Sequence, residues 1–278
     1  MKTDNLPTLS PDDLPMNANH RPGLLPILLV TVIVIVLGLS LSKFSTSSSS
    51  LVEADFWLIY HGDASRQQRT EATVRLIDAG NEVWNGADLT GVTLSGLNLS
   101  LVDIQNANLN ESLLVGTDLS GAALNRTDLD AADLQNANLI GASLKEVSLL
   151  RSNLNGANFE LTNLGKASLE QITAKKTNFS GADLSESHCL MADFSDAILI
   201  DAKFDYANLE AVVFHRADIT NVNFQGALLL DTDFQDSNWW RAVGINQELQ
   251  ADFKDRFAPS ERAPQTFRDD YHQWLQEQ

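Results

Sequence analysis

The chain has 278 residues, of which 44% are hydrophobic and 20% are charged, as is typical of a folded protein with a large core. Its formal net charge of -18 disfavours binding to nucleic acid phosphates or anionic lipid head groups, and it favours solubility or basic partners. The single cysteine, Cys189, excludes an internal disulfide framework.

The N-terminal part is predicted to be a disordered tail followed by a membrane anchor. Residues 1–23 carry four prolines among polar residues, a composition that does not bury enough apolar surface to become ordered. Residues 24–42 contain no charge over nineteen positions, which is the length that a helix needs to cross a bilayer. We therefore expect a transmembrane helix there, with a cleaved signal peptide as the alternative. Lys2 and Arg21 before this segment and Lys43 behind it favour a single-pass membrane protein whose C-terminal part is exported.

A linker and a helix are predicted next. Residues 43–64 form a Ser-rich linker and juxtamembrane segment, whose aromatic side chains could lie at a membrane interface or pack on the following domain. Ser65 and Gln68 have the spacing of a capping box, which predicts a helix over residues 66–79. This helix would belong to an N-terminal capping segment over residues 65–85.

A period of five residues then begins and continues without a slip. From Leu89 to Trp239 nearly every fifth residue is Leu, Phe or Ile, with Ala174, Cys189 and Trp239 as the exceptions, and the residue two positions earlier is usually small. This period matches neither an amphipathic helix, whose apolar residues recur every 3.6 residues, nor a strand, whose side chains recur every 2.0 residues on one face. If each unit forms one side of a square coil, the large and the small residue both face the interior. The other three residues of the unit face solvent.

The pattern A-(D/N)-L-x-x, seen in "ADLSE" and "ANLIG", resembles the pentapeptide repeat family. The resemblance implies an all-β solenoid, namely a right-handed quadrilateral parallel β-helix with four units per coil. The open ends of such a solenoid expose unpaired backbone and apolar interior, so we expect short helical caps at both ends. Its coils would stack at the usual strand spacing of roughly 4.8 Å. The thirty-one centres place about eight coils in residues 86–241. Because such proteins are abundant in photosynthetic bacteria, the resemblance allows a periplasmic or a lumenal location for the exported part.

The phenylalanines provide an internal test of four units per coil, because units twenty residues apart should stack directly. Every phenylalanine at a centre has another one twenty residues away: Phe159 with Phe179, Phe204 with Phe224, and Phe214 with both Phe194 and Phe234. We therefore expect columns of stacked rings in the second half of the solenoid, where leucine fills the first half.

Past Trp239 the period fails, and residues 242–278 are predicted to form a C-terminal helical cap. Two helical stripes support this prediction, the first with Ile245, Leu249, Phe253 and Phe257, the second with Phe267, Tyr271, Trp274 and Leu275. A separate partner-binding hairpin is the alternative.

No motif predicts an enzyme. The five histidines lack the spacing of a zinc site, and the chain has no phosphate loop, nucleophile elbow, dinucleotide fingerprint or calcium loop. Carboxylates directly before a centre are expected to bond the backbone of neighbouring turns rather than to form a catalytic pair. We therefore expect no catalytic residue, no metal ligand and no cofactor.

The candidate interaction surface consists of apolar residues that face outward. The residues that follow the centres on one side of the coil are, twenty apart, Leu150, Glu170, Leu190, Glu210 and Leu230, with Leu228 close by. The opposite side carries Ile140, Ile198, Ile200 and Trp240. Aligned apolar residues on a flat β-face could form a docking strip or a self-association surface.

Two functions compete at this point. The first is a non-catalytic, membrane-anchored scaffold that mediates protein–protein interaction with an unidentified partner or with itself, and that binds no nucleic acid. The second follows from the resemblance alone: an acidic rod that imitates DNA and binds a type II topoisomerase. The expected transmembrane segment and the apolar interruptions of the acidic faces favour the scaffold.

Overall fold

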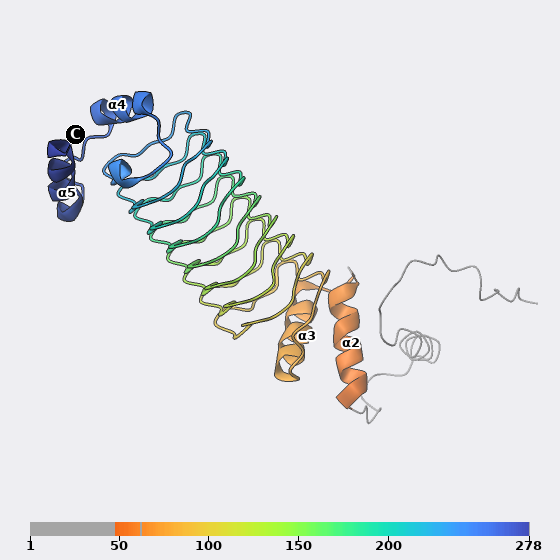
Figure 1. The fold of residues 1–278 in the computed structure, drawn as a ribbon. Helices are drawn as coiled ribbons and strands as arrows, with labels where there is room; N and C mark the ends of the chain where they lie inside the picture. The colour runs from red at the N-terminus through yellow and green to blue at the C-terminus, as the bar shows by residue number, and fades with distance from the viewer. Residues whose placement is uncertain (1–47, 62, 278) are drawn as a thin grey trace, which may run out of the picture. The chain divides into compact units, whose positions relative to one another are not determined.

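The computed structural model describes residues 48–61 and 63–277 (Figure 1). Its helical elements are α2 (Ser48–Tyr60), α3 (Arg66–Asp78), the 3-10 turn η2 (Trp239–Arg241), α4 (Gln247–Arg256) and α5 (Gln265–Gln276). The compact unit that begins at Asp55 contains the repeat, which runs as a stack of coils between α3 and η2 (Figure 1).

The predicted localisation needs correction. No helix within the described ranges is both long enough and apolar enough to span a membrane, which contradicts the expectation of a single-pass membrane protein. The expected tail, residues 1–23, and the expected transmembrane helix, residues 24–42, lie outside the described part of the chain. Much of the segment expected to be a linker, residues 43–64, is helical, because α2 extends over Ser48–Tyr60.

Parallel bridges between residues twenty positions apart define the coil. Within the described residues they keep this spacing from Val83 with Asp103 to Asn223 with Val243, and the one step without a bridge is that from Asp218 to Asn238. Since each unit has five residues, one coil has four sides, and the predicted four-sided β-helix is confirmed. We name the faces by their first and last centres: face A from Leu89 to Leu229, face B from Leu94 to Phe234, face C from Leu99 to Trp239 and face D from Ile104 to Phe224.

Local hydrogen bonds turn the chain at each corner. An Asp or Asn directly before the centre accepts a bond from the amide two residues later, as Asp183 does from Ser185 at 3.0 Å and Asn208 from Glu210 at 3.1 Å. The residue two after the centre usually adopts the left-handed backbone, for example Met191 with φ 59°. The abundance of Asp and Asn in the repeat therefore serves backbone turns.

The interior is filled by the centres, and the aromatic columns are those that the phenylalanine spacing predicts. The ring of Phe214 stacks on Phe194 and Phe234, with centroids 5.4 and 5.3 Å apart. It also meets Phe204 and Phe224 edge-on, at 6.1 and 5.9 Å. All five rings are buried. Each ring thus contacts the column of its own face and the column of the opposite face, since these phenylalanines are centres of faces B and D.

Helix α3 lies against the first coil. Ser65 is its N-cap, and the side chains of Ser65 and Gln68 each accept a hydrogen bond from the other's amide, which completes a capping box. The guanidinium of Arg69 on α3 donates to the carbonyl of Thr90 at 3.0 Å and lies 3.4 Å from the carboxylate of Asp88. These contacts cover the open start of face A, and the hydroxyl of Thr70 on α3 accepts a hydrogen bond from the amide of Thr93, at the start of face B, at 3.1 Å.

Helices α4 and α5 pack at the other end of the stack (Figure 1). The ring of Phe253 on α4 lies 4.9 Å from Phe234, the last centre of face B. Trp239, the last centre of face C, donates from its indole nitrogen to the carbonyl of Phe257 at 3.0 Å, and its ring lies 5.5 Å from that of Trp274 on α5. The aromatic columns of the interior therefore continue into the C-terminal helices.

Candidate functional site

Face A carries aligned apolar side chains at the positions that follow its centres. Parallel bridges connect its units through Ser148, Ser168, His188, Asn208 and Leu228. These bridges place Leu150, Glu170, Leu190, Glu210 and Leu230 in one column, as the sequence predicts. Leu150 and Leu190 are partly exposed, and Leu230 is 54% exposed.

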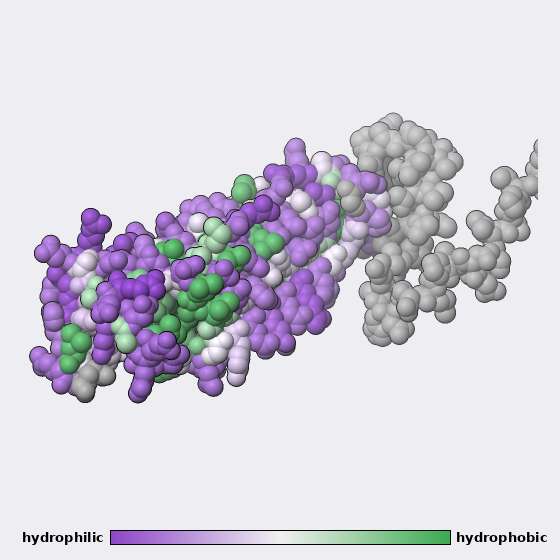
Figure 2. All heavy atoms as spheres, turned by 90° about the horizontal axis from the view of Figure 1, so that it is seen from above, coloured by the Kyte–Doolittle hydropathy of each residue, from purple (hydrophilic) through white to green (hydrophobic). Residues whose placement is uncertain are grey.

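Two further residues widen this column. Leu228 is 50% exposed, and Met191, which the sequence analysis did not single out, is 57% exposed beside Leu190. The signal for Met191 is its position two residues after the centre, which turns its side chain to solvent. We define the face A strip as Leu150, Leu190, Met191, Leu228 and Leu230. Figure 2 shows one rod face on which hydrophobic side chains gather among mostly hydrophilic ones.

The charged groups along the same part of face A are acidic. Its outward positions from Ser168 to Asp231 include Glu170 and Glu210 but no Lys or Arg. One carboxylate oxygen of Glu170 is buried and accepts no hydrogen bond within the described structure.

Cys189 belongs to the interior of this face and not to its surface. It is a fully buried centre, and burial raises the pKa of its thiol to about 12, with the charge of Glu170 as a smaller contribution in the same direction. A thiol in this environment stays protonated and is not a nucleophile.

The apolar residues of face C do not form a comparable strip. Ile198 and Ile200 flank one centre, whereas Ile140 lies three coils away from Ile200. The exposed leucines of this face rest on glycines of the next coil: a β-carbon added at Gly121 would meet the side chain of Leu101 at 2.7 Å. Face C is therefore the weaker candidate surface.

Trp240 was expected on the surface of face C, and this prediction is wrong. The residue is only 7% exposed, because α5 folds back over it. Its indole nitrogen donates to the carboxylate of Asp270 at 2.6 Å, and its ring lies 4.7 Å from that of Tyr271. Trp240 thus attaches the C-terminal helix to the β-helix.

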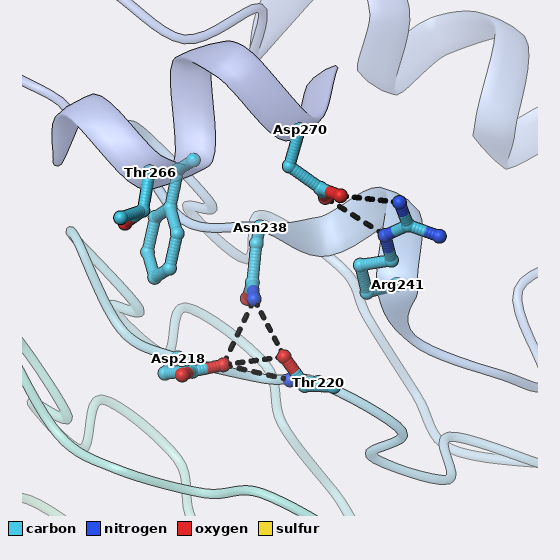
Figure 3. Close-up of a pocket in the computed structure, with 7 residues that line it drawn as sticks. Asp218, Thr220, Asn238, Arg241, Thr266 and Asp270 are labelled. Carbon is cyan, nitrogen blue, oxygen red and sulfur yellow. Dashed lines mark hydrogen bonds and ion pairs between the residues drawn. The ribbon is translucent and has the colours of Figure 1, made fainter. Parts of the chain in front are cut away.

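A pocket lies where α5 meets the end of face C (Figure 3). Asn238 donates from its side-chain nitrogen to Asp218 and to Thr220, both at 2.8 Å. Across the pocket, Arg241 donates to Asp270 at 2.7 Å. This bond lowers the pKa of the Asp270 carboxyl, against the opposing effect of burial. Because these side chains already bond one another, we interpret the pocket as part of the contact that holds α5 against the end of the β-helix.

Comparison with solved structures finds other repeat solenoids at low identity. A trypsin-treated variant of QnrB1, a plasmid-mediated fluoroquinolone resistance protein, has 16% identity and a TM-score of 0.46, with 62% of this chain and 88% of that chain covered. HetL, involved in heterocyst differentiation regulation in the cyanobacterium Nostoc, has 24% identity and a TM-score of 0.23, with 60% of this chain and 95% of HetL covered. Rfr23 from the cyanobacterium Cyanothece has 20% identity and a TM-score of 0.26, covering 59% and 94%.

The search of curated proteins found no match to this chain. The family model described as pentapeptide repeats matches in 8 copies, in overlapping stretches that extend from residue 85 to residue 236 and cover more than half of the chain. These matches coincide with the units of five that build the four faces. The chain therefore belongs to the pentapeptide repeat family.

Proposed function

We propose that this chain is a non-catalytic interaction protein whose β-helix binds a protein partner through the face A strip. The observation that carries the proposal is the alignment of Leu190, Met191, Leu228 and Leu230 on one rigid face, where they remain partly or largely exposed. Covering apolar surface is favourable by about 25 cal/mol per Å². Aligned residues on a rigid scaffold provide this gain without an ordering cost on their own side of the interface.

The acidic residues in the strip's column define the chemistry of the partner. Glu170 and Glu210 alternate with Leu150, Leu190 and Leu230. A partner that combines apolar side chains with Lys or Arg matches this alternation.

An acidic rod that imitates DNA and binds a type II topoisomerase is the second candidate, favoured by the net charge of -18. Ion pairs weaken this candidate, because they neutralise part of the acidic surface. Asp196 lies 2.7 Å from Arg216 on face B, and Glu146 lies 2.8 Å from Arg126 on face D. A gyrase supercoiling assay with the purified chain tests it, since a DNA mimic should inhibit the enzyme.

Leu190→Glu tests the strip. The coil should accept this change because Glu170 and Glu210 occupy the same column. Gln225→Glu is the matched control, since Gln225 holds the equivalent position of a unit on face D and is exposed. We expect a partner captured by the wild-type chain, once purified, to bind Leu190→Glu at least about tenfold more weakly and the control unchanged. Equal binding by all three chains would exclude the strip as the binding surface.

Self-association through the same strip is measured separately. Sedimentation of the wild-type chain over a range of concentrations should give one constant mass if the partner is a different protein. A mass that rises with concentration in the wild type, and not in Leu190→Glu, would make a second copy of this chain the partner.

A further inference from the structure

The last unit of face A, residues 227–231, lies at an open edge of the β-helix. One coil earlier, the amides of Leu209 and Ala211 donate to backbone carbonyls of this unit, both at 2.9 Å. The equivalent amides of the last unit belong to Leu229 and Asp231. Neither finds an acceptor in the described structure, because the chain leaves the register at η2 and does not form another coil on this face.

Side-chain burial also differs at this edge. Leu229 is partly exposed, whereas the other centres from Leu89 to Trp239, all within the described ranges, are buried. The amide of Phe234, the centre of the adjoining unit, likewise has no backbone acceptor there, but Phe253 and Phe257 cover its ring. The unit at 227–231 is thus paired with the coil before it but unpaired on its outer side, and its centre is incompletely covered.

We propose that residues 227–231 form a strand-addition site, which takes an extended segment of a partner protein as the next unit of the solenoid. The segment's carbonyls would accept the amide hydrogens of Leu229 and Asp231, in the way that residues 227–231 serve the coil before them. A large apolar residue of the segment, two positions after a small one, would cover Leu229. The proposal rests on the proposed function as a protein-binding rod and names the form of the partner.

Charge complementarity defines the segment further. Glu210 lies one coil before this edge and Asp231 lies on it, and no Lys or Arg occupies the outward positions of face A from Ser168 onward. The added segment therefore carries Lys or Arg beside its apolar residue. The exposed side chains of Leu228 and Leu230 connect this edge to the face A strip.

Amide hydrogen exchange of the full chain, measured by NMR, tests the site. In the free chain, Leu229 and Asp231 should exchange faster than Leu209 and Ala211, which are hydrogen-bonded one coil earlier. Equal, slow exchange at all four amides would mean that the edge is already covered, and it would overturn the proposal.

The probe is a nine-residue peptide that copies residues 205–213 with Asp205 and Glu210 replaced by lysine. This peptide holds one complete unit, with Ala207 small and Leu209 large. At a concentration ten times its dissociation constant, the peptide should slow the exchange of the Leu229 and Asp231 amides about tenfold. The unmodified copy should bind more weakly because its charge is acidic, and a lysine version with Leu209→Asp should not bind. Strand addition would be refuted if the lysine peptide did not slow amide exchange, or if the lysine peptide with Leu209→Asp slowed it equally.

Two variants of the chain test whether the peptide protects these amides by binding at the edge. Leu230→Lys places a charge on the edge, where Lys is a known means of blocking strand addition, and Lys145 and Lys175 hold the same position in other units. Gln225→Lys is the control, since its unit on face D is already paired through Asn223 with Val243. Peptide protection should be lost in Leu230→Lys and kept in Gln225→Lys. Protection that survives in Leu230→Lys would count against the site.

Leu190→Glu separates this proposal from the proposed function. The change lies two coils before the edge, so peptide protection of Leu229 should persist in it even though the strip is altered. Persistent protection together with undiminished binding of the captured protein means that the strip assignment fails and the edge site stands. Loss of peptide protection in Leu190→Glu means that the peptide lies along the strip, and strand addition is then wrong.

Discussion

The first half of the β-helix, from Leu89 to Leu154, is filled by aliphatic centres, whereas seven of the seventeen centres in the second half, from Phe159 on, are phenylalanines that form columns. Both halves keep the same bridges between residues twenty apart and the same hydrogen bonds at the corners. The coil therefore accepts either an aliphatic or an aromatic residue at the inward centre of a unit. What differs is the contact between centres: Phe214 touches four other rings, whereas the centres from Leu89 to Leu154 include no aromatic ring.

The outer surfaces of the two halves differ as well. Most of the exposed apolar residues of face A, namely Leu190, Met191, Leu228 and Leu230, lie in the second half. Interior and exterior positions alternate within each unit, so the outward residues can change without any change of the interior. This separation suits a scaffold, because binding residues can vary while the coil persists.

The largest effect is expected for Phe214→Ala, which removes a ring sealed on every side. We expect a loss of about 3 to 5 kcal/mol of the free energy of unfolding, measured by urea denaturation followed by circular dichroism. The matched change in the leucine half is Leu114→Ala in the same column of face B, for which about 2 to 3 kcal/mol is expected. A larger loss at Leu114 than at Phe214 would mean that the aromatic half is not the more tightly packed one.

A double replacement of Phe194 and Phe214 should show coupling of about 1 kcal/mol, because their rings stack at 5.4 Å. The reference pair is Phe159 with Phe214, whose units lie more than two coils apart and should give additive losses. Strict additivity for the stacked pair would show that the aromatic columns contribute only by their volume.

The register of the coil could be predicted because its information is both local and repeated. Each unit carries its own inward pair, and the spacing of Phe194 and Phe214 adds the long-range fact that four units close one coil. The helix over residues 66–79 could likewise be placed, since Ser65 and Gln68 form the capping box that defines the start of α3.

The burial of Trp240 could not be predicted, because it depends on a contact with Asp270, thirty residues away in the sequence. By the period alone, Trp240 holds an outward position. The open edge at Leu229 was missed for the same reason: it follows from where α4 and α5 pack, and helical periodicity does not state which side of the last coil they leave uncovered.

A smaller effect on the free energy of unfolding is expected from pH, at the contact of Asp270 on α5 with Arg241 and Trp240. Hydrogen bonds from Arg241, and then from Trp240, lower the pKa of Asp270 despite its partial burial. A carboxyl group whose folded pKa lies below its unfolded value of about 3.9 stabilises the fold above that value, and this contribution is lost as pH falls through the folded pKa. Asp270→Asn should therefore be less stable than the wild type near neutral pH, and the difference should shrink below about pH 4.

The measurement is the urea midpoint of both chains between about pH 7 and pH 2. Arg241→Gln is the companion variant, because it removes the first cause of the lowered pKa and should reduce the same pH dependence. A stability difference that stays constant down to about pH 2 would show that the carboxylate's charge is not what attaches α5 to the β-helix.

The smallest effect on stability is expected in the face A strip, because its side chains are exposed and do not belong to the packed interior. Met191→Lys changes a residue that is 57% exposed and has a left-handed backbone with φ 59°. Lys166 and Lys176 occupy the equivalent corner position with φ 62° and 57°, so the coil accepts lysine there. Unfolding should change by no more than about 0.5 kcal/mol, as it should for Gln171→Lys one coil earlier. Binding of the captured partner should weaken in Met191→Lys, because a charge then replaces an apolar contact in the strip. A loss of stability as large as that of Leu114→Ala would mean that Met191 belongs to the packed interior and is not free to bind.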